Sequence, residues 1–262
     1  MDVLYFENIN TKTMERFKYY LQTQGLKNTS IHNYLRTIRA VYNKAVKIEG
    51  VQDNKPFAGV FNDVTVRARR LKNRYMDKKL LGQFRDLELT HPSHQRVVDL
   101  SMLQFYLGGM DLIDIYYMER ANLVGGRYYY TRKKLGARGY EIDIMVPPQA
   151  LEIIKRYQGN DKKYLFDWLK LPAAYRNFRS NQIRRLKSIQ QKHDLILLPT
   201  NAALNTKTFR HTFATIAKFE HVDPDLIREL MGHERNDIDT VYKDKFLTQE
   251  RDAAQMKIIS LE

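Results

Sequence analysis

The chain of 262 residues contains no cysteine. This absence excludes a disulfide scaffold, a thiol nucleophile and a structural zinc site built from cysteines. Glycine and proline number only 12 and 7, which argues against collagen-like and low-complexity chains, while 43% hydrophobic residues suffice for a folded core. No apolar run approaches the roughly 18 residues of a membrane span, and the first ten residues lack the layout of a signal peptide. We therefore expect a cytoplasmic globular protein without a membrane segment.

Acidic residues are in the minority. The chain has 44 Lys and Arg against 30 Asp and Glu, a formal net charge of +14. The excess is concentrated near the N-terminus, since residues 1–82 contain 16 Lys and Arg but only 7 Asp and Glu. Such an excess favours a polyanionic partner, because each phosphate contact releases condensed counterions. The alternative is a basic protein that is merely soluble.

The N-terminal residues have the pattern of two amphipathic helices. One lies between Asn10 and Gly25, and the other begins at Asn28 or Thr29, either of which is a suitable N-cap. Along the second helix a polar row recurs at steps of three and four residues and so shares one face: Arg36, Arg39, Asn43 and Lys47. This row predicts a DNA-facing surface, although a solvated helix face has the same pattern.

A basic stretch without helical periodicity follows, and it contains Arg67, Arg69 and Arg70. We interpret it as a connector between two domains: residues 1–73, with the basic linker from about residue 58, and residues 74–262. The connector either follows a phosphate backbone or is a solvated linker. A second cationic segment is the helix predicted over 172–191, in which Arg184 and Arg185 are candidate phosphate contacts.

Residues 206–246 collect the side chains that carry chemistry. Lys207 and Arg210 lie one turn apart on an expected helix, His233 follows a helix-ending Gly232, and Tyr242 comes nine residues after His233. Upstream, two strand-like runs, 127–131 and 140–146, flank a basic turn and predict a β-hairpin with cations at its tip.

These residue types fit transesterification at phosphate. An arginine presents a planar fork of donors to two phosphate oxygens, and Lys or His adds hydrogen bonds where negative charge develops. A tyrosine is a poor nucleophile at neutral pH, but neighbouring cations favour its phenolate. Attack by Tyr242 would give a phosphotyrosine ester. No cofactor is expected, because the attacking atom belongs to the protein and the cations take the place of a metal.

At these residues the sequence resembles the tyrosine recombinases, also called phage-type integrases. The resemblance is carried by KTFRHTFAT at 207–215, LMGH at 230–233 and Tyr242, and it is specific because several residue types and two separations agree. Residues 11–57 resemble the family's helical core-binding domain, and residues 74–262 resemble its catalytic domain. The resemblance implies a mainly α fold with a small β-hairpin or sheet (α+β) that closes around DNA as a C-shaped clamp.

The resemblance also implies a role for each matched position. Tyr242 would attack the scissile phosphate, leaving a 3′-phosphotyrosyl bond and a free 5′-hydroxyl. Arg210 and His233 would hold the phosphate oxygens, Lys207 would stand where a histidine is usual, and Lys134 in the hairpin turn would be the general acid. The implied protein is a metal- and ATP-independent site-specific recombinase or integrase of a mobile element, associated with the nucleoid. It would bind its core site in double-stranded DNA and act as a homotetramer in the synaptic complex, while being a monomer in free solution.

One position departs from the family pattern. Asp111 stands where the family has its first arginine, and an acid cannot hold a phosphate. Either another cation substitutes, with Arg127, Arg132 and Arg138 as candidates, or activity is weakened. Two alternatives therefore stay open: a DNA-binding relative that no longer cuts, and a type IB topoisomerase-like enzyme. The apolar C-terminal segment, 247–262, is expected to pack either on its own domain or on a neighbouring subunit.

Overall fold

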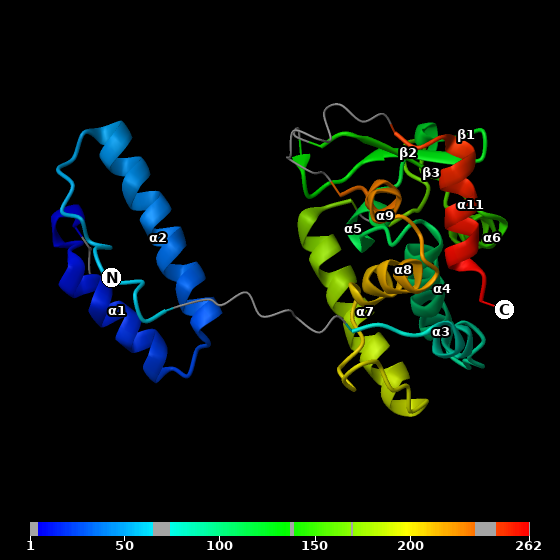
Figure 1. Ribbon diagram of the computed structural model, residues 1–262, viewed down its shortest axis with the longest axis horizontal. Helices are drawn as coiled ribbons and strands as arrows, with labels where there is room; N and C mark the ends of the chain where they lie inside the picture. Colours follow the sequence, from blue (N-terminus) through cyan, green and yellow to red (C-terminus); the bar gives the residue numbers. More distant parts are fainter. Residues whose placement is uncertain (1–4, 65–73, 137–138, 169, 234–244, 262) are drawn as a thin grey trace. The chain divides into compact units, whose positions relative to one another are not determined.

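The computed structural model describes residues 5–64, 74–136, 139–168, 170–233 and 245–261. The chain separates into two compact units, Met1–Leu71 and Lys72–Glu262 (Figure 1). Among the described residues, no helix combines the length and the apolar character needed to cross a bilayer.

The first unit is built on α1 (Thr11–Thr23) and α2 (Asn28–Glu49), preceded by the 3-10 turn η1 (Phe6–Asn8). Asn10 caps α1, because its side chain accepts a hydrogen bond from the Thr13 N–H at 3.0 Å. The predicted cap of α2 is wrong: the helix begins at Asn28, so Lys27 occupies the cap position without a side-chain cap bond. A small core joins both helices to the segment that follows them, through Met14, Leu21, Ile31, Leu35, Val60 and Val64.

The second unit is organised around α4 (Pro92–Tyr106), which is buried from Val97 to its end. Helices α3 (Lys78–Arg85), α6 (Pro148–Tyr157), α7 (Pro172–Lys192) and α8 (Thr208–Phe219) pack against it. The remaining helical elements are α5 (Leu112–Tyr116), η2 (Arg120–Asn122), α9 (Pro224–Met231) and α11 (Thr248–Ile259). Buried polar side chains of α4 make hydrogen bonds: Asp99 accepts from Gln95, Ser101 donates to the Val97 carbonyl, and the Gln104 amide nitrogen donates to the Met110 carbonyl.

A three-stranded antiparallel sheet completes the second unit. Its order is β1 (Leu123–Val124), β2 (Arg127–Thr131) and β3 (Glu141–Met145), with Tyr129 paired to Asp143. Alternate side chains of β2 and β3 are buried, which gives the strands one core face. The prediction of a mainly α fold with a small β-sheet is thus confirmed, and the predicted C-shaped clamp stays a prediction.

The C-terminal helix α11 packs on its own domain, beside β3 (Figure 1). Ile258 and Ile259 are buried in the main core. The Gln255 side chain donates to the carbonyls of Tyr106 and Met145, both at 2.9 Å. The sequence left two placements open for this segment, on its own domain or on a neighbouring subunit. In the structure it packs on its own domain.

Candidate functional site

Arg210 joins the start of α8 to two other segments. Its guanidinium is buried; Nη1 donates to the Gly109 carbonyl at 2.8 Å, and Nη2 donates to the Met231 carbonyl at 2.6 Å. The same Nη2 lies 2.7 Å from Nε2 of His233. Gly109 permits this approach, since a Cβ there would lie 3.1 Å from the Arg210 Cα. Arg210 therefore links the turn before α5 to the end of α9.

His233 is held in the neutral form. Its Nε2 must accept the hydrogen bond from Arg210, because a guanidinium only donates, and this assigns the ring proton to Nδ1. Partial burial, together with the charges of Arg210 and Arg132, lowers the pKa of His233 to about 4. At neutral pH the ring thus offers an Nδ1–H donor without a charge.

Asp111 is the N-cap residue of α5 and is shared by two cations. Its Oδ2 lies 2.9 Å from Nη2 of Arg132, and its Oδ1 lies 2.5 Å from Nζ of Lys207. Burial alone would raise the pKa of Asp111, but the hydrogen bond from Lys207 and the Arg210 charge hold the pKa below its ordinary value. The carboxylate is therefore ionised, and the half-exposed Lys207 side chain opens the cluster to solvent.

A buried glutamine fixes the two backbone segments of this cluster relative to each other. Nε2 of Gln104, on α4, donates to the Met110 carbonyl at 2.9 Å and to the Thr206 carbonyl at 3.1 Å. These carbonyls immediately precede Asp111 and Lys207. One side chain in the core thus sets the spacing of the ion pair, and this long-range contact has no signature in the local sequence.

The hairpin turn is tied to α5 beside the cluster. The Lys133 N–H donates to the Asp114 carboxylate at 2.8 Å, and the Lys133 ammonium lies 5.1 Å from the centre of the Tyr117 ring. The neighbouring Lys134 is exposed. Both lysines are exposed, and Lys133 makes these contacts with α5 and Tyr117.

Two comparisons find proteins that resemble this chain. Residues 1–64 match the family model of the phage integrase SAM-like domain. The Tn1549 transposon integrase in complex with transposon right end DNA is similar over 97% of this chain and 86% of that one, with a TM-score of 0.61 and 15% identity. This chain has the tyrosine recombinase fold. No curated protein sequence matches it.

Two further structures share the tyrosine recombinase fold. A lambda integrase dimer bound to a COC′ core site matches over 93% of this chain and 83% of that one, with a TM-score of 0.57 and 14% identity. The XerH site-specific recombinase bound to difH, in a pre-cleavage complex, matches over 87% and 65%, with a TM-score of 0.57 and 19% identity. Identities this low relate the folds only.

The structure brings together some of the predicted site residues of this recombinase fold. Arg210, His233 and Lys207 form one cluster around Asp111, with Lys134 on the turn that follows Arg132. Tyr242 lies outside the described residues, as do Arg67, Arg69 and Arg70. Within the described ranges, no three His, Asp or Glu side chains are grouped as metal ligands. Arg132 was one of three unranked candidates, because sequence separation does not reveal which arginine reaches Asp111.

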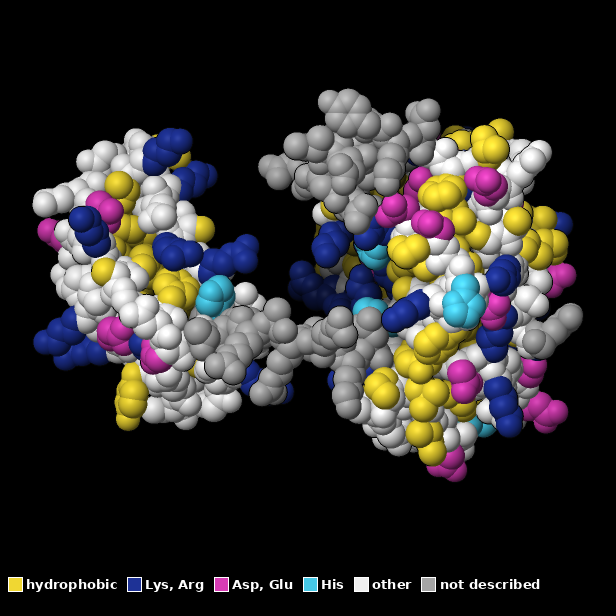
Figure 2. Space-filling model, in the orientation of Figure 1, with side chains coloured by type: hydrophobic (Ala, Val, Ile, Leu, Met, Phe, Trp, Pro, Cys, Tyr) yellow, Lys and Arg dark blue, Asp and Glu magenta, His cyan; other side chains and the backbone are white. Residues whose placement is uncertain are grey.

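The predicted DNA-binding residues lie on two helices. On α2 the predicted row is exposed throughout, and the Arg39 guanidinium also lies 4.5 Å from the centre of the Phe61 ring. On α7, Arg184 is exposed and Arg185 is half-buried. Lys and Arg side chains, with histidines among them, gather along one edge of the second unit (Figure 2). The described candidates are therefore accessible to a ligand.

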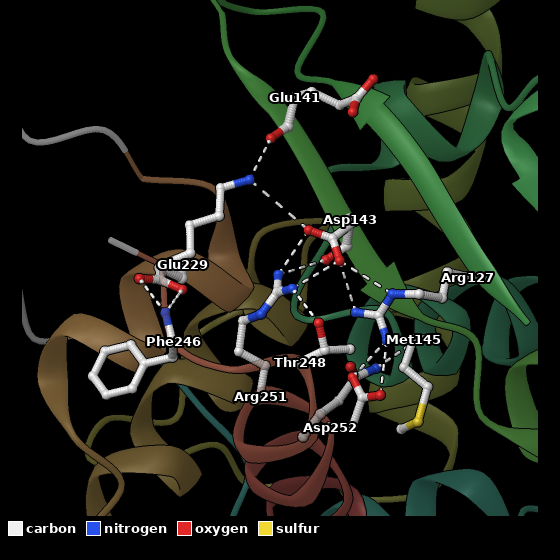
Figure 3. A network of polar contacts seen from close by, with 11 residues as sticks. Arg127, Glu141, Asp143, Met145, Glu229, Phe246, Thr248, Arg251 and Asp252 are labelled. Carbon is white, nitrogen blue, oxygen red and sulfur yellow. Dashed lines mark hydrogen bonds and ion pairs between the residues drawn. The ribbon is translucent and has the colours of Figure 1, made fainter. Parts of the chain in front are cut away.

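Arg127, another candidate for the missing arginine, is engaged elsewhere. It pairs with Asp143 at 2.9 Å and with Asp252 at 2.7 Å, and Asp143 also pairs with Arg251 at 2.7 Å (Figure 3). We call these four residues the α11 clasp, because they join β2 and β3 to α11. Arg127 is thus paired with Asp143 and Asp252 and not with Asp111. Arg138 lies outside the described residues.

Proposed function

We propose that this protein is a site-specific DNA recombinase or integrase that cleaves and rejoins strands through a 3′-phosphotyrosine intermediate. The observation that carries the proposal is the contact between Arg210 and His233 beside Lys207, at the spacing that places Tyr242 nine residues on. Hydrogen-bond donors that are buried and already positioned stabilise the negative charge that develops on the phosphate. The fold and the phage integrase SAM-like match support DNA as the partner.

In the proposed reaction, the Tyr242 oxygen forms a bond to phosphorus while the bond from phosphorus to the 5′ oxygen breaks. The phenol gives its proton to water, and the neighbouring cations favour the phenolate. Arg210 donates from its fork to the non-bridging oxygens, and His233 donates from Nδ1. Lys134 passes a proton to the departing 5′ oxygen. The reverse sequence rejoins a strand, and the energy of the phosphodiester is kept in the ester, so ATP is not needed.

The remaining cations hold the duplex in this proposal. The exposed row on α2 and the cations of α7 contact phosphates, and strand exchange takes place in a homotetramer on two DNA sites. A chain that binds this way releases counterions, so the logarithm of its affinity falls with the logarithm of salt concentration. A slope near zero would contradict phosphate contacts at both helices.

The test begins with duplexes selected from a random library by binding to the full chain. Nicks tiled along a selected duplex trap any covalent intermediate, because the short strand beyond the nick diffuses away. We expect a covalent adduct with the wild type and with Tyr19→Phe, an exposed tyrosine of α1 that serves as control. Tyr242→Phe should give none. Tight binding without any wild-type adduct would instead identify a DNA-binding protein that does not cut.

A further inference from the structure

Arg132 is a buried arginine whose donors are only partly used by the protein. It is 7% exposed, its Nη1 donates to the Gly232 carbonyl at 3.0 Å, and its Nη2 pairs with Asp111. Its Nε–H is buried without a partner among the described residues. An unpaired buried donor on a charged group is costly, and such groups gather where a ligand is to be bound.

Arg132 and Arg210 are held side by side at the end of one helix. Arg210 donates to the Met231 carbonyl and Arg132 to the carbonyl of the next residue, Gly232. Arginine side chains at a helix C-terminus are favoured by the helix dipole. Burial lowers the pKa of Arg210. The two guanidinium groups are also close enough for the Arg132 charge to lower it, by a smaller amount. Like charges this near each other require a counter-ion.

The cluster has fewer negative charges than positive ones. Arg132, Arg210 and Lys207 are cations, and Asp111 is the carboxylate that they share. Asp114, one turn further along α5, is also buried, and burial raises its pKa to about 6. Even with both carboxylates ionised and His233 neutral, positive charge is in excess. A phosphodiester entering from the side of Lys207 would balance it.

We propose that Arg132 is a catalytic residue that donates to a non-bridging oxygen of the scissile phosphate, and that Asp111 is the residue that positions Arg132 and Lys207. The aspartate that stands in place of the family's first arginine then holds a cation at this place, namely Arg132, the residue that follows β2. This assignment rests on the proposed function. It excludes Arg127, whose guanidinium pairs with Asp143 and Asp252 in the α11 clasp.

The test compares Arg132→Gln with wild type in single-turnover cleavage of the nicked duplex. A phosphodiester substrate is compared with one that carries a methylphosphonate at the mapped scissile position. The methylphosphonate is neutral, so it has less need of a cation. We expect Arg132→Gln to cleave the phosphodiester about 100- to 1000-fold more slowly than wild type. With at least one methylphosphonate diastereomer the deficit should shrink to about tenfold or less.

Arg127→Gln is the matched control, because Arg127, at the start of β2, is also an arginine with low exposure. Any loss that it causes through folding should be the same on both substrates. Arg132→Lys keeps the charge without the fork, and it should cleave at an intermediate rate with a deficit that is again smaller on the methylphosphonate. If Arg132→Gln unfolds below the assay temperature, Arg132→Lys is compared with wild type in its place.

Asp111→Asn tests the positioning role. If Asp111 only repelled phosphate, its neutralisation would accelerate cleavage, whereas loss of positioning slows it on the phosphodiester and less on the methylphosphonate. Acceleration would overturn the role of Asp111. A wild-type adduct together with an unchanged Arg132→Gln rate would overturn the role of Arg132 alone. Absence of any wild-type adduct would overturn both the inference and the proposed function.

Discussion

Asp114 shows how burial changes the chemistry of one side chain. Burial, with a smaller contribution from the Asp111 charge, raises its pKa from 3.8 to about 6, although the Lys133 N–H donates to it. The folded chain therefore binds this proton more tightly than the unfolded chain. On account of this group, the free energy of unfolding falls as pH rises from about 4 to about 6, by up to about 3 kcal/mol.

Asp114→Asn should remove that dependence while keeping an oxygen that accepts from Lys133. We expect the variant to be more stable than wild type at pH 7.5, and the gain to vanish near pH 4. Urea unfolding at both pH values, followed by Trp168 fluorescence, measures the difference. An equal difference between variant and wild type at the two pH values would show that Asp114 does not titrate between them.

Gly232 links backbone conformation to the site. Its φ is +62°, and a Cβ there would lie 2.2 Å from Cδ1 of Ile142 and 3.2 Å from Cδ of Arg132. Gly232→Ala therefore adds a steric clash to the strain of a left-handed residue. We expect a loss of about 2–4 kcal/mol in the free energy of unfolding.

Gly125→Ala separates these two effects. Gly125 has a similar φ of +57°, but nothing lies within 4 Å of its Cβ position. This variant should lose only the backbone contribution, about 1–2 kcal/mol. Denaturant unfolding of the two variants measures the difference, and equal losses would mean that the Ile142 side chain moves away at little cost.

At the scale of elements, the α11 clasp fixes where the C-terminal helix begins. Asp143, on β3, accepts from Nη1 and Nη2 of Arg251 at 2.7 and 2.9 Å and also pairs with Arg127 (Figure 3). Close by, the Phe246 N–H donates to the Glu229 carboxylate at 3.2 Å. Helix α11 is thereby held to β3, and Phe246, just before the helix, is held to α9.

Asp143→Asn should weaken this attachment strongly. It leaves two largely buried arginines without their shared carboxylate, so we expect a loss of about 3 kcal/mol in the free energy of unfolding. Asp86→Asn is the control: Asp86 pairs with Arg85 at the surface, with a side chain 62% exposed, and should cost less than about 1 kcal/mol. Comparable losses from the two substitutions would show that the clasp contributes no more than a surface pair.

For the molecule as a whole, helical periodicity predicted several elements, and the resemblance to the tyrosine recombinases predicted the fold class. The α2 and α7 segments and the hairpin follow from patterns within a few residues. Three site residues, Lys207 before α8, Arg210 on α8 and His233 after α9, follow from the motif on which the resemblance rests. The partner of Asp111 does not follow. Arg132 is 21 residues away, just after β2, and only the packing set by Gln104 and the hairpin brings the two together.

The two units have separate cores, and this predicts two unfolding transitions. The core of the first unit shares no residue with that of the second among the described residues. A unit of this size rarely gains more than about 3–5 kcal/mol from its core, so the first unit should unfold at lower denaturant concentration than the larger second unit.

The single tryptophan makes this prediction measurable. Trp168 belongs to the second unit and stacks on Phe166, with ring centres 4.5 Å apart, so its fluorescence reports that unit alone. Far-UV circular dichroism reports the helices of both units. We expect the dichroism to begin falling before the fluorescence changes, and Gly232→Ala to shift only the fluorescence transition and the matching part of the dichroism. Coincident transitions would mean that contacts between the units make them unfold together, because separate cores alone give no such coupling.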